Sequence, residues 1–257
     1  GRIDSAIVFA DNLSEATSVL PWEGGLLVAA APDILFLKDT TGDYRADVRE
    51  VLFTGFFANN SEAQITNLHY NVDNWIYASN CGQDGLVKFM QNPKLPPISV
   101  KGGDFRFRLD RGQFEIESST GQFGMSVDEW GNRFFTENSL HIQHAPIAGR
   151  YLFRHQFLPS YDVALNISDH DPEMFQKTPA PYWRQERTKR RNEQFAEAKL
   201  DRHEYAEDHF TGASGGTFYG GNLLPEEYRG SVFTGEVAGN LIHRDVVQPL
   251  PNRPTFV

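Results

Sequence analysis

Short apolar segments separated by turn residues recur along this chain. In each copy, a turn with Gly, Asn or Asp leads into an apolar or aromatic segment, which a loop of small residues joins to a second such segment. Segments of this length and composition, bounded by turn residues, indicate β-strands. The copies are residues 24–39, 73–89, 131–144 and 229–245. The pattern therefore predicts a repeated unit built on two strands.

The spacing of the copies predicts the fold. Trp75 follows Leu26 by 49 residues, Arg133 follows Trp75 by 58, and Ser231 follows Arg133 by 98. A repeat of roughly 50 residues, made of short strands and turns, is typical of β-propeller blades, which bury the faces of their sheets by packing round a channel. We therefore expect an all-β chain that forms a single β-propeller domain over residues 1–257. A two-sheet sandwich is the alternative, but sandwiches do not repeat at this spacing.

The longest spacing contains a polar stretch at about residues 159–211, which we interpret as an insertion between two units. Residues 184–200 contain no Gly or Pro and many helix-forming residues, so they predict one helix. Five of the eight residues from 184 to 191 are basic. They form either a solvated helix face, supported by i, i+4 pairs such as Glu186 and Arg190, or a patch that docks an anionic partner.

The last residues, 254–257, have the pattern of a strand that is only beginning. Four complete units are fewer than the roughly six or seven blades that we expect at this repeat length. Either blades without the pattern lie within residues 90–120 and 145–165, or the propeller is incomplete in this chain.

Composition and charge exclude several functions. A net charge of −10 disfavours a protein that binds nucleic acid through its phosphates. No apolar run approaches the roughly 18–20 residues of a transmembrane helix, and no basic segment followed by an apolar one marks a signal peptide. Cys81 is the single cysteine, so no disulfide forms within the chain.

Residues 39–50 follow the ligand spacing of an EF-hand calcium loop, although their apolar flanks predict strands and not helices. The residues at the ligand positions are Asp39, Thr41, Asp43, Arg45 (through its carbonyl), Asp47 and Glu50. Two departures are Thr41, where an acid is commoner, and Tyr44, where Gly usually makes the sharp turn. The loop either holds a calcium ion that stiffens it or consists of solvated turn residues.

Four segments of the chain resemble a known family. They are residues 32–56, 66–79, 124–138 and 212–245. These segments are similar to the propeller domain of the planctomycete-type "membrane-bound dehydrogenase" family, which is related to the soluble quinoprotein glucose and sorbosone dehydrogenases. The resemblance implies a six-bladed propeller in a periplasmic or secreted protein, with its signal peptide removed, that oxidises a sugar or polyol with pyrroloquinoline quinone. No Cys-x-x-Cys-His is present, so this chain carries no covalent haem.

Oxidation of a sugar hydroxyl needs a base for its proton while hydride passes to the quinone. The resemblance implies that a His supplies this base and that an Arg fixes the cofactor. The corresponding positions hold Ala63 with Gln64, and Thr120, so both expected residues are missing. His69, six residues after Ala63, either takes the role of the base or is a satisfied core or channel-lining residue.

Further histidines and acids supply candidate catalytic residues. Asp169 and His170 lie in a dense acid–base group on a predicted loop, where functional residues tend to sit, although a plain surface loop is the alternative. With His69, they are the predicted catalytic residues. His141 and His144 are three residues apart on a predicted strand and therefore point to opposite faces, so they do not easily hold one ion.

Residues 212–221 form a glycine-rich cluster. Glycine allows a ligand or a neighbouring strand to approach the backbone closely, and the Lys of a phosphate loop is absent. We interpret the cluster as the start of a channel-facing strand. The predicted cofactor-binding residues are Ser214, Thr217 and Tyr219 from this cluster, together with Gln64 and Asn67.

Two functions are consistent with these patterns. The first is an exported quinoprotein-like dehydrogenase that acts on a sugar or polyol and contains a structural calcium ion. The second is a non-catalytic propeller that binds carbohydrate or a protein partner. In either case the basic helix at residues 184–191 is a candidate docking surface for an acidic partner, such as a cytochrome, in a larger assembly.

Overall fold

The computed structural model describes residues 3–154, 157 and 163–257. The chain divides into two compact units. Unit 1 contains Gly1–Gln122 and Ile147–Val163, and unit 2 contains Phe123–Pro146 and Ala164–Val257. The fold is mostly β, with several sheets. Closure of the sheets into a propeller stays a prediction.

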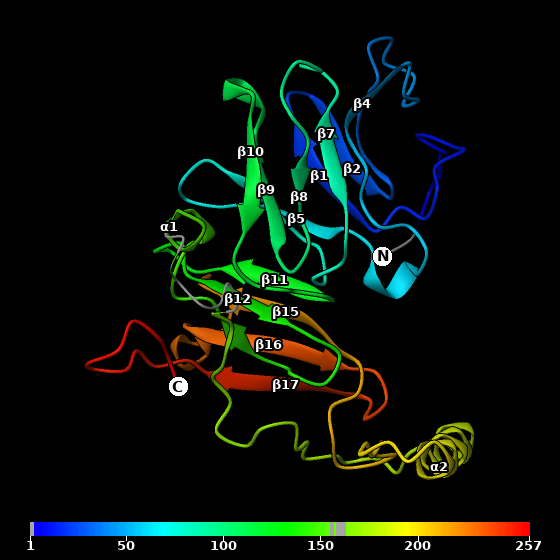
Figure 1. Cartoon of the computed structure of the whole chain (residues 1–257), viewed down its shortest axis with the longest axis vertical. Coiled ribbons are helices and arrows are strands. Elements are labelled where there is room, and N and C mark those ends of the chain that lie inside the picture. Colours follow the sequence, from blue (N-terminus) through cyan, green and yellow to red (C-terminus); the bar gives the residue numbers. More distant parts are fainter. Residues whose placement is uncertain (1–2, 155–156, 158–162) are drawn as a thin grey trace. The chain divides into compact units, whose positions relative to one another are not determined.

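Unit 1 contains two antiparallel sheets (Figure 1). The first has the order β1-β2-β3-β4-β7-β8, with bounds Ser18–Trp22, Gly25–Ala30, Asp33–Lys38, Val48–Thr54, Leu86–Phe89 and Ile98–Ser99. The second has the order β10-β9-β6-β5, with bounds Gln113–Glu117, Asp104–Arg108, Ile76–Ser79 and Thr66–Tyr70. The short helix α1, Gly149–Leu152, also belongs to this unit.

Every second side chain of strand β9 packs into the core of unit 1. Phe105 and Phe107 are completely buried, and their ring centroids lie 5.2 and 4.9 Å from the ring of Phe53. The intervening Arg106 points to the other face of the strand, as a period of two requires. There its buried guanidinium pairs with the carboxylates of Glu115 and Glu117. The same strand therefore contributes to an aromatic core and to a buried ionic network.

Unit 2 contains a seven-stranded sheet with the order β14-β13-β12-β11-β15-β16-β17. The bounds in chain order are β11 Gly124–Val127, β12 Arg133–Thr136, β13 Gln143–His144, β14 Leu165–Asn166, β15 Ala213–Tyr219, β16 Ser231–Glu236 and β17 Leu241–Val246. β11 and β15 are parallel and meet at Gly124 and Gly215, whereas the other pairs are antiparallel. A Cβ atom on Gly124 would lie 2.5 Å from the backbone of Gly215. The strand β11 therefore approaches the backbone of the glycine-rich cluster closely.

The repeat read from the sequence matches three pairs of adjacent strands. Three copies of the repeat fold as the paired strands β2–β3, β12–β13 and β16–β17. The second copy, residues 73–89, contains its two strands, β6 and β7, but they do not pair with each other. Its strands β6 and β7 lie in different sheets, because β6 pairs with β5 and β9 whereas β7 pairs with β4. The chain segment between β6 and β9 contains the strands β7 and β8.

The insertion contains the predicted helix. α2, Tyr182–Glu197, follows β14 and precedes β15 along the chain and is labelled in Figure 1. Residues 159–162 of the insertion fall outside the described residues. Buried Arg184 donates to Thr211, and Glu204 forms ion pairs with Arg187 and Arg191. Three of the five basic residues are therefore used within unit 2. Within the described residues, no helix combines the length and the hydropathy that crossing a membrane requires.

Candidate metal centre

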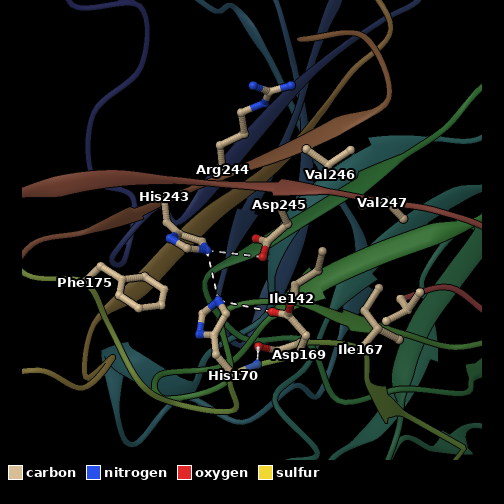
Figure 2. Close-up of a pocket in the computed structure, with 12 residues that line it drawn as sticks. Ile142, Ile167, Asp169, His170, Phe175, His243, Arg244, Asp245, Val246 and Val247 are labelled. Carbon is tan, nitrogen blue, oxygen red and sulfur yellow. Dashed lines mark hydrogen bonds and ion pairs between the residues drawn. The ribbon is translucent and has the colours of Figure 1, made fainter. Parts of the chain in front are cut away.

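Four side chains of unit 2 converge on one point. They are His141, His170, His243 and Asp245, each offering one ligand atom, and these atoms all lie within 4.8 Å of one another. Across residues 3–154, 157 and 163–257, this is the only group of three or more His, Cys, Asp or Glu side chains with such spacing. Figure 2 shows His170, His243 and Asp245 directed toward one another. The arrangement is compatible with a bound metal ion.

Strand alternation positions two of the four side chains. His243 and Asp245 are two residues apart on β17, so they share one face of the sheet. Arg244, between them, points the other way (Figure 2), where its guanidinium donates to Ser231 and to the Glu227 carbonyl. This charge is therefore held away from the cluster.

The other two side chains come from connecting segments. His141 lies just before β13, where its carbonyl accepts a hydrogen bond from the Thr234 hydroxyl at 3.1 Å. His170 lies in the loop after β14, where its backbone N–H donates to the Ser168 hydroxyl at 3.1 Å. The cluster therefore joins the sheet to the beginning of the insertion.

Three of the separations between the candidate ligand atoms match those expected round a small metal ion, in a group whose atoms all lie within 4.8 Å. Asp245 Oδ1 lies 3.2 Å from His141 Nε2 and 3.2 Å from His243 Nε2. His243 Nε2 lies 3.2 Å from His170 Nε2. Tetrahedral ligands at about 2.0–2.1 Å from zinc are separated from one another by roughly 3.3 Å. Three separations in the cluster therefore fit without rearrangement.

A hydrogen bond outside the cluster determines which nitrogen of neutral His170 is protonated. His170 Nδ1 lies 2.8 Å from the Glu173 carbonyl oxygen, which can only accept, so Nδ1 carries the hydrogen. Nε2 then presents a lone pair toward His243. This tautomer is the one that metal-binding histidines adopt when a carbonyl holds their other nitrogen.

Asp245 contributes the negative charge of the cluster. Burial acts to raise the pKa of its carboxyl, but hydrogen bonds and charge interactions with His141 and His243 together outweigh burial and lower this pKa to about 2. The carboxylate is therefore ionised at neutral pH. Its Oδ2 atom is buried and has no hydrogen-bond partner among the described residues. A buried anionic oxygen without a partner is costly unless a cation neutralises it.

The cluster has one closed side and one open side. His141 is completely buried, and its ring stacks on Phe210 with a centroid distance of 4.2 Å. On the other side, a cavity of about 320 Å³ is bordered by His170, His243 and Asp245. Asp169 also borders the cavity, with Oδ1 3.9 Å from His170 Nε2.

The donor set favours some metals over others. Imidazole nitrogens with one carboxylate suit Zn²⁺ and other divalent transition metals. Ca²⁺ prefers six to eight oxygen ligands, which this cluster does not offer. The predicted calcium ion therefore does not belong here.

Two of the predicted catalytic residues, Asp169 and His170, lie at the candidate metal centre in unit 2. His69 lies on β5 of unit 1, half-buried, where burial lowers the pKa of its imidazole. His141 and His144 separate as their spacing predicts: His144 lies 3.1 Å from the Thr255 hydroxyl and stays outside the cluster. The participation of His141 was not predicted, nor was that of His243 and Asp245.

The predicted cofactor-binding residues have other contacts within their units. The Gln64 amide donates to Glu15 and to the Ala58 carbonyl. The Asn67 amide donates to Ser79 and to the Gln122 carbonyl. Ser214 and Thr217 flank an irregularity in β15, and the Tyr219 hydroxyl accepts from the Leu224 N–H at 2.6 Å. None of the five borders the cavity at the cluster.

The loop at residues 39–50 is organised by its own carboxylates. Asp39 accepts hydrogen bonds from the backbone N–H groups of Thr41, Gly42 and Tyr44 at 2.7–2.9 Å. The bond from Gly42, followed by those from Tyr44 and Thr41, lowers the pKa of Asp39. Asp47 accepts from the N–H and hydroxyl of Thr40. Calcium binding by Asp39, Thr41, Asp43, Arg45, Asp47 and Glu50 remains a prediction.

The fold and the site define a mostly β protein with a candidate centre for a metal ion. The chain belongs to the family described as "Domain of unknown function (DUF7133)", whose profile matches residues 1–255. No curated protein matches the chain.

Proposed function

We propose that this protein binds one divalent transition-metal ion of the zinc type in unit 2 and uses it to hold a small ligand. The observation that carries the proposal is the convergence of three imidazoles and one carboxylate within 4.8 Å. The tautomer of His170 and the ionised Asp245 supply lone pairs and negative charge at the same point. The cavity beside them supplies room for a ligand.

Metal analysis of the purified protein tests this proposal. We expect about one zinc ion per chain after loading and dialysis. His243→Ala and Asp245→Asn should each weaken zinc binding by more than about 100-fold, because each removes a proposed ligand and not merely an outer contact. His203→Ala is the matched control, since His203 is exposed and outside the cluster. Equal zinc binding by all four proteins would refute the proposal.

The family resemblance supports a second candidate, a quinoprotein-like sugar or polyol dehydrogenase in an exported protein. One observation favours it: strands that begin successive sections of the chain lie side by side. The Leu68 N–H on β5 donates to the Ser18 hydroxyl on β1, and β11 pairs with β15. Such strands are expected around the channel of a propeller. The residues do not fit the quinone chemistry, however, because Gln64 and Thr120 stand where the His and Arg are expected, and the Gln64 amide is already bonded.

Addition of pyrroloquinoline quinone and calcium, followed by an assay of dye reduction with a panel of sugars and polyols, separates the two candidates. Turnover that requires the quinone would establish the dehydrogenase. Absence of quinone binding and of turnover would leave the metal-dependent function, or the non-catalytic binding of carbohydrate.

We also propose that residues 39–50 bind a structural calcium ion. Tyr44 has φ of +64°, the left-handed conformation that the sixth position of a calcium loop usually takes with Gly. Calorimetric titration should detect calcium binding that Asp39→Ala abolishes and that His243→Ala leaves unchanged. No calcium binding by the unaltered protein would remove this part of the account.

A further inference from the structure

The ring planes of the histidines distinguish ligands from supporting residues. The rings of His141 and His170 stack 13° from parallel, with centroids 4.8 Å apart. An imidazole lone pair lies in the plane of its ring, so two stacked rings do not direct their lone pairs at one ion. The ring of His243 stands at 82° to His141 and at 72° to His170, so it can share an ion with either.

We propose that His170, His243 and Asp245 are the three protein ligands of the ion, and that His141 is a positioning residue that holds Asp245. This inference rests on the proposed metal-binding function and assigns an activity to the same site. The three ligands all border the cavity, where their side chains are about one-seventh exposed, at 14%, 14% and 15%. His141 is completely buried behind them and has no access to the cavity.

The contacts of the two stacked rings support this assignment. The Glu173 carbonyl leaves His170 Nε2 unprotonated, as a ligand must be. His141 Nε2 lies 3.2 Å from Asp245 Oδ1 and donates its hydrogen there. Hydrogen bonding of a ligating carboxylate by an outer residue orients the ligand.

Three protein ligands leave a coordination position open toward the cavity. Zinc sites with two histidines and one carboxylate hold a water molecule in that position, and zinc makes this water a nucleophile at neutral pH. The Asp169 carboxylate, 3.9 Å from a ligand atom, is within reach of such a water and can take its proton. The site therefore has the parts required for metal-assisted hydrolysis.

The walls of the cavity indicate the class of substrate. Ile142, Ile167, Val247 and Val257 give it an aliphatic surface. The Arg244 guanidinium is bonded elsewhere, so among the described residues that border the cavity Asp169 is the one charged side chain outside the ligand set that faces it. An anionic substrate would meet this carboxylate and find no cation except the metal. We therefore assign an uncharged ester with a short aliphatic acyl group.

The reaction is a hydrolysis without redox change. The metal-bound water forms a bond to the ester carbonyl carbon while Asp169 takes its proton. The bond from that carbon to the alcohol oxygen then breaks, and Asp169 returns the proton to the departing oxygen. The products are a carboxylic acid and an alcohol.

Hydrolysis of 4-nitrophenyl butyrate by the zinc-loaded protein tests the activity. Asp169→Asn should lower kcat by about 10²–10⁴-fold while the zinc content stays unchanged, because a general base contributes an effect of this size. Asp171→Asn changes an exposed acid of the same loop that does not border the cavity, so it is the matched control and should retain full activity. The negatively charged mono-4-nitrophenyl succinate should be hydrolysed more slowly than the butyrate.

Cobalt substitution tests the ligand assignment separately. Azide should change the visible spectrum of the cobalt protein, because it takes the open position. His141→Ala should weaken metal binding by about 10–100-fold, His141→Gln should recover part of this loss, and His170→Ala should weaken binding further than either. A metal-loaded protein that neither responds to azide nor hydrolyses the ester would overturn this inference and leave the proposed metal binding intact. Absence of metal binding would overturn both.

Discussion

His170 and His243 direct their Nε2 atoms at each other across 3.2 Å, although 73 positions separate them along the chain. His170 belongs to a loop of the insertion and His243 to the strand β17. Two imidazole nitrogens at this distance need a shared hydrogen or a shared ion. The Glu173 carbonyl fixes the hydrogen of His170 on Nδ1, so His243 Nε2 supplies the shared hydrogen when no ion is bound. A metal ion in its place would satisfy both nitrogens and join the loop to the sheet.

Zinc should therefore stabilise unit 2. At a free concentration 100 times its Kd, an ion that binds only the folded state adds about 2.7 kcal/mol to the free energy of unfolding. We expect a higher Tm in zinc than in chelator, and slower amide exchange in residues 164–176. His243→Ala should remove both effects, and His203→Ala should preserve them. Amide exchange in this loop that zinc does not change would contradict the joining role.

The buried His144 should make stability depend on pH. Burial, assisted by the positive charge of Arg133, lowers the pKa of His144 to about 4, whereas Asp128 opposes this shift. Between about pH 6.5 and 4 the unfolded chain binds a proton that the folded chain excludes, so stability is fully present above pH 6.5 and falls as the pH decreases. The loss reaches up to about 3 kcal/mol.

Denaturant unfolding in chelator at pH 7.5 and pH 4.5 measures this dependence. His144→Gln should show a smaller difference in the free energy of unfolding between the two pH values than the unaltered protein. His203→Gln, at an exposed site, should show the same difference as the unaltered protein. Identical pH dependence in the His144 variant would show that another group is responsible.

The ionic network of unit 1 should be sensitive to the loss of its cation. Arg106 is almost completely buried, and its Nε lies 3.1 Å from the buried Glu117 carboxylate. Its guanidinium also stacks 4.4 Å from the centroid of Trp75. Arg106→Met removes the cation and leaves the carboxylate in place, which typically costs about 3–5 kcal/mol.

Chemical denaturation of the Arg106→Met protein checks this value, with Arg108→Met as the control. Arg108 lies on the same strand and pairs with the exposed Asp110, so its replacement should have little effect. Equal stability of the two variants would show that the network does not contribute in the way described.

The spacing of the repeated strands explains how much of the fold the sequence predicts. The spacing of Leu26, Arg133 and Ser231 identified three pairs of adjacent strands, because these strands follow one another directly in the chain. It did not identify the partner of β6 in the copy that contains Trp75. That partner is β9, and the strands between β6 and β9 in the chain join another sheet. Pairing between distant strands leaves no periodic signal to read.

The candidate metal centre was only half visible in the sequence. Asp169 and His170 stood out as a dense group, and the i, i+2 spacing of His243 and Asp245 on a strand was a signal that places both on one face. Nothing local connects them with His141, which lies just before β13. β13 and β17 are not neighbours in the strand order of the sheet, so only tertiary packing brings His141 to Asp245. The glycine-rich residues 212–221 were correctly associated with close approach, which here is made by β11.

X-ray absorption at the zinc edge of the loaded protein tests the central claim most directly. We predict a first shell of two imidazole nitrogens and two oxygens, one from Asp245 and one from water, at about 2.0–2.1 Å. His243→Ala should remove one nitrogen from this shell. A shell of six or more oxygens, or one that does not change in the variant, would contradict the assignment of the ion to this cluster.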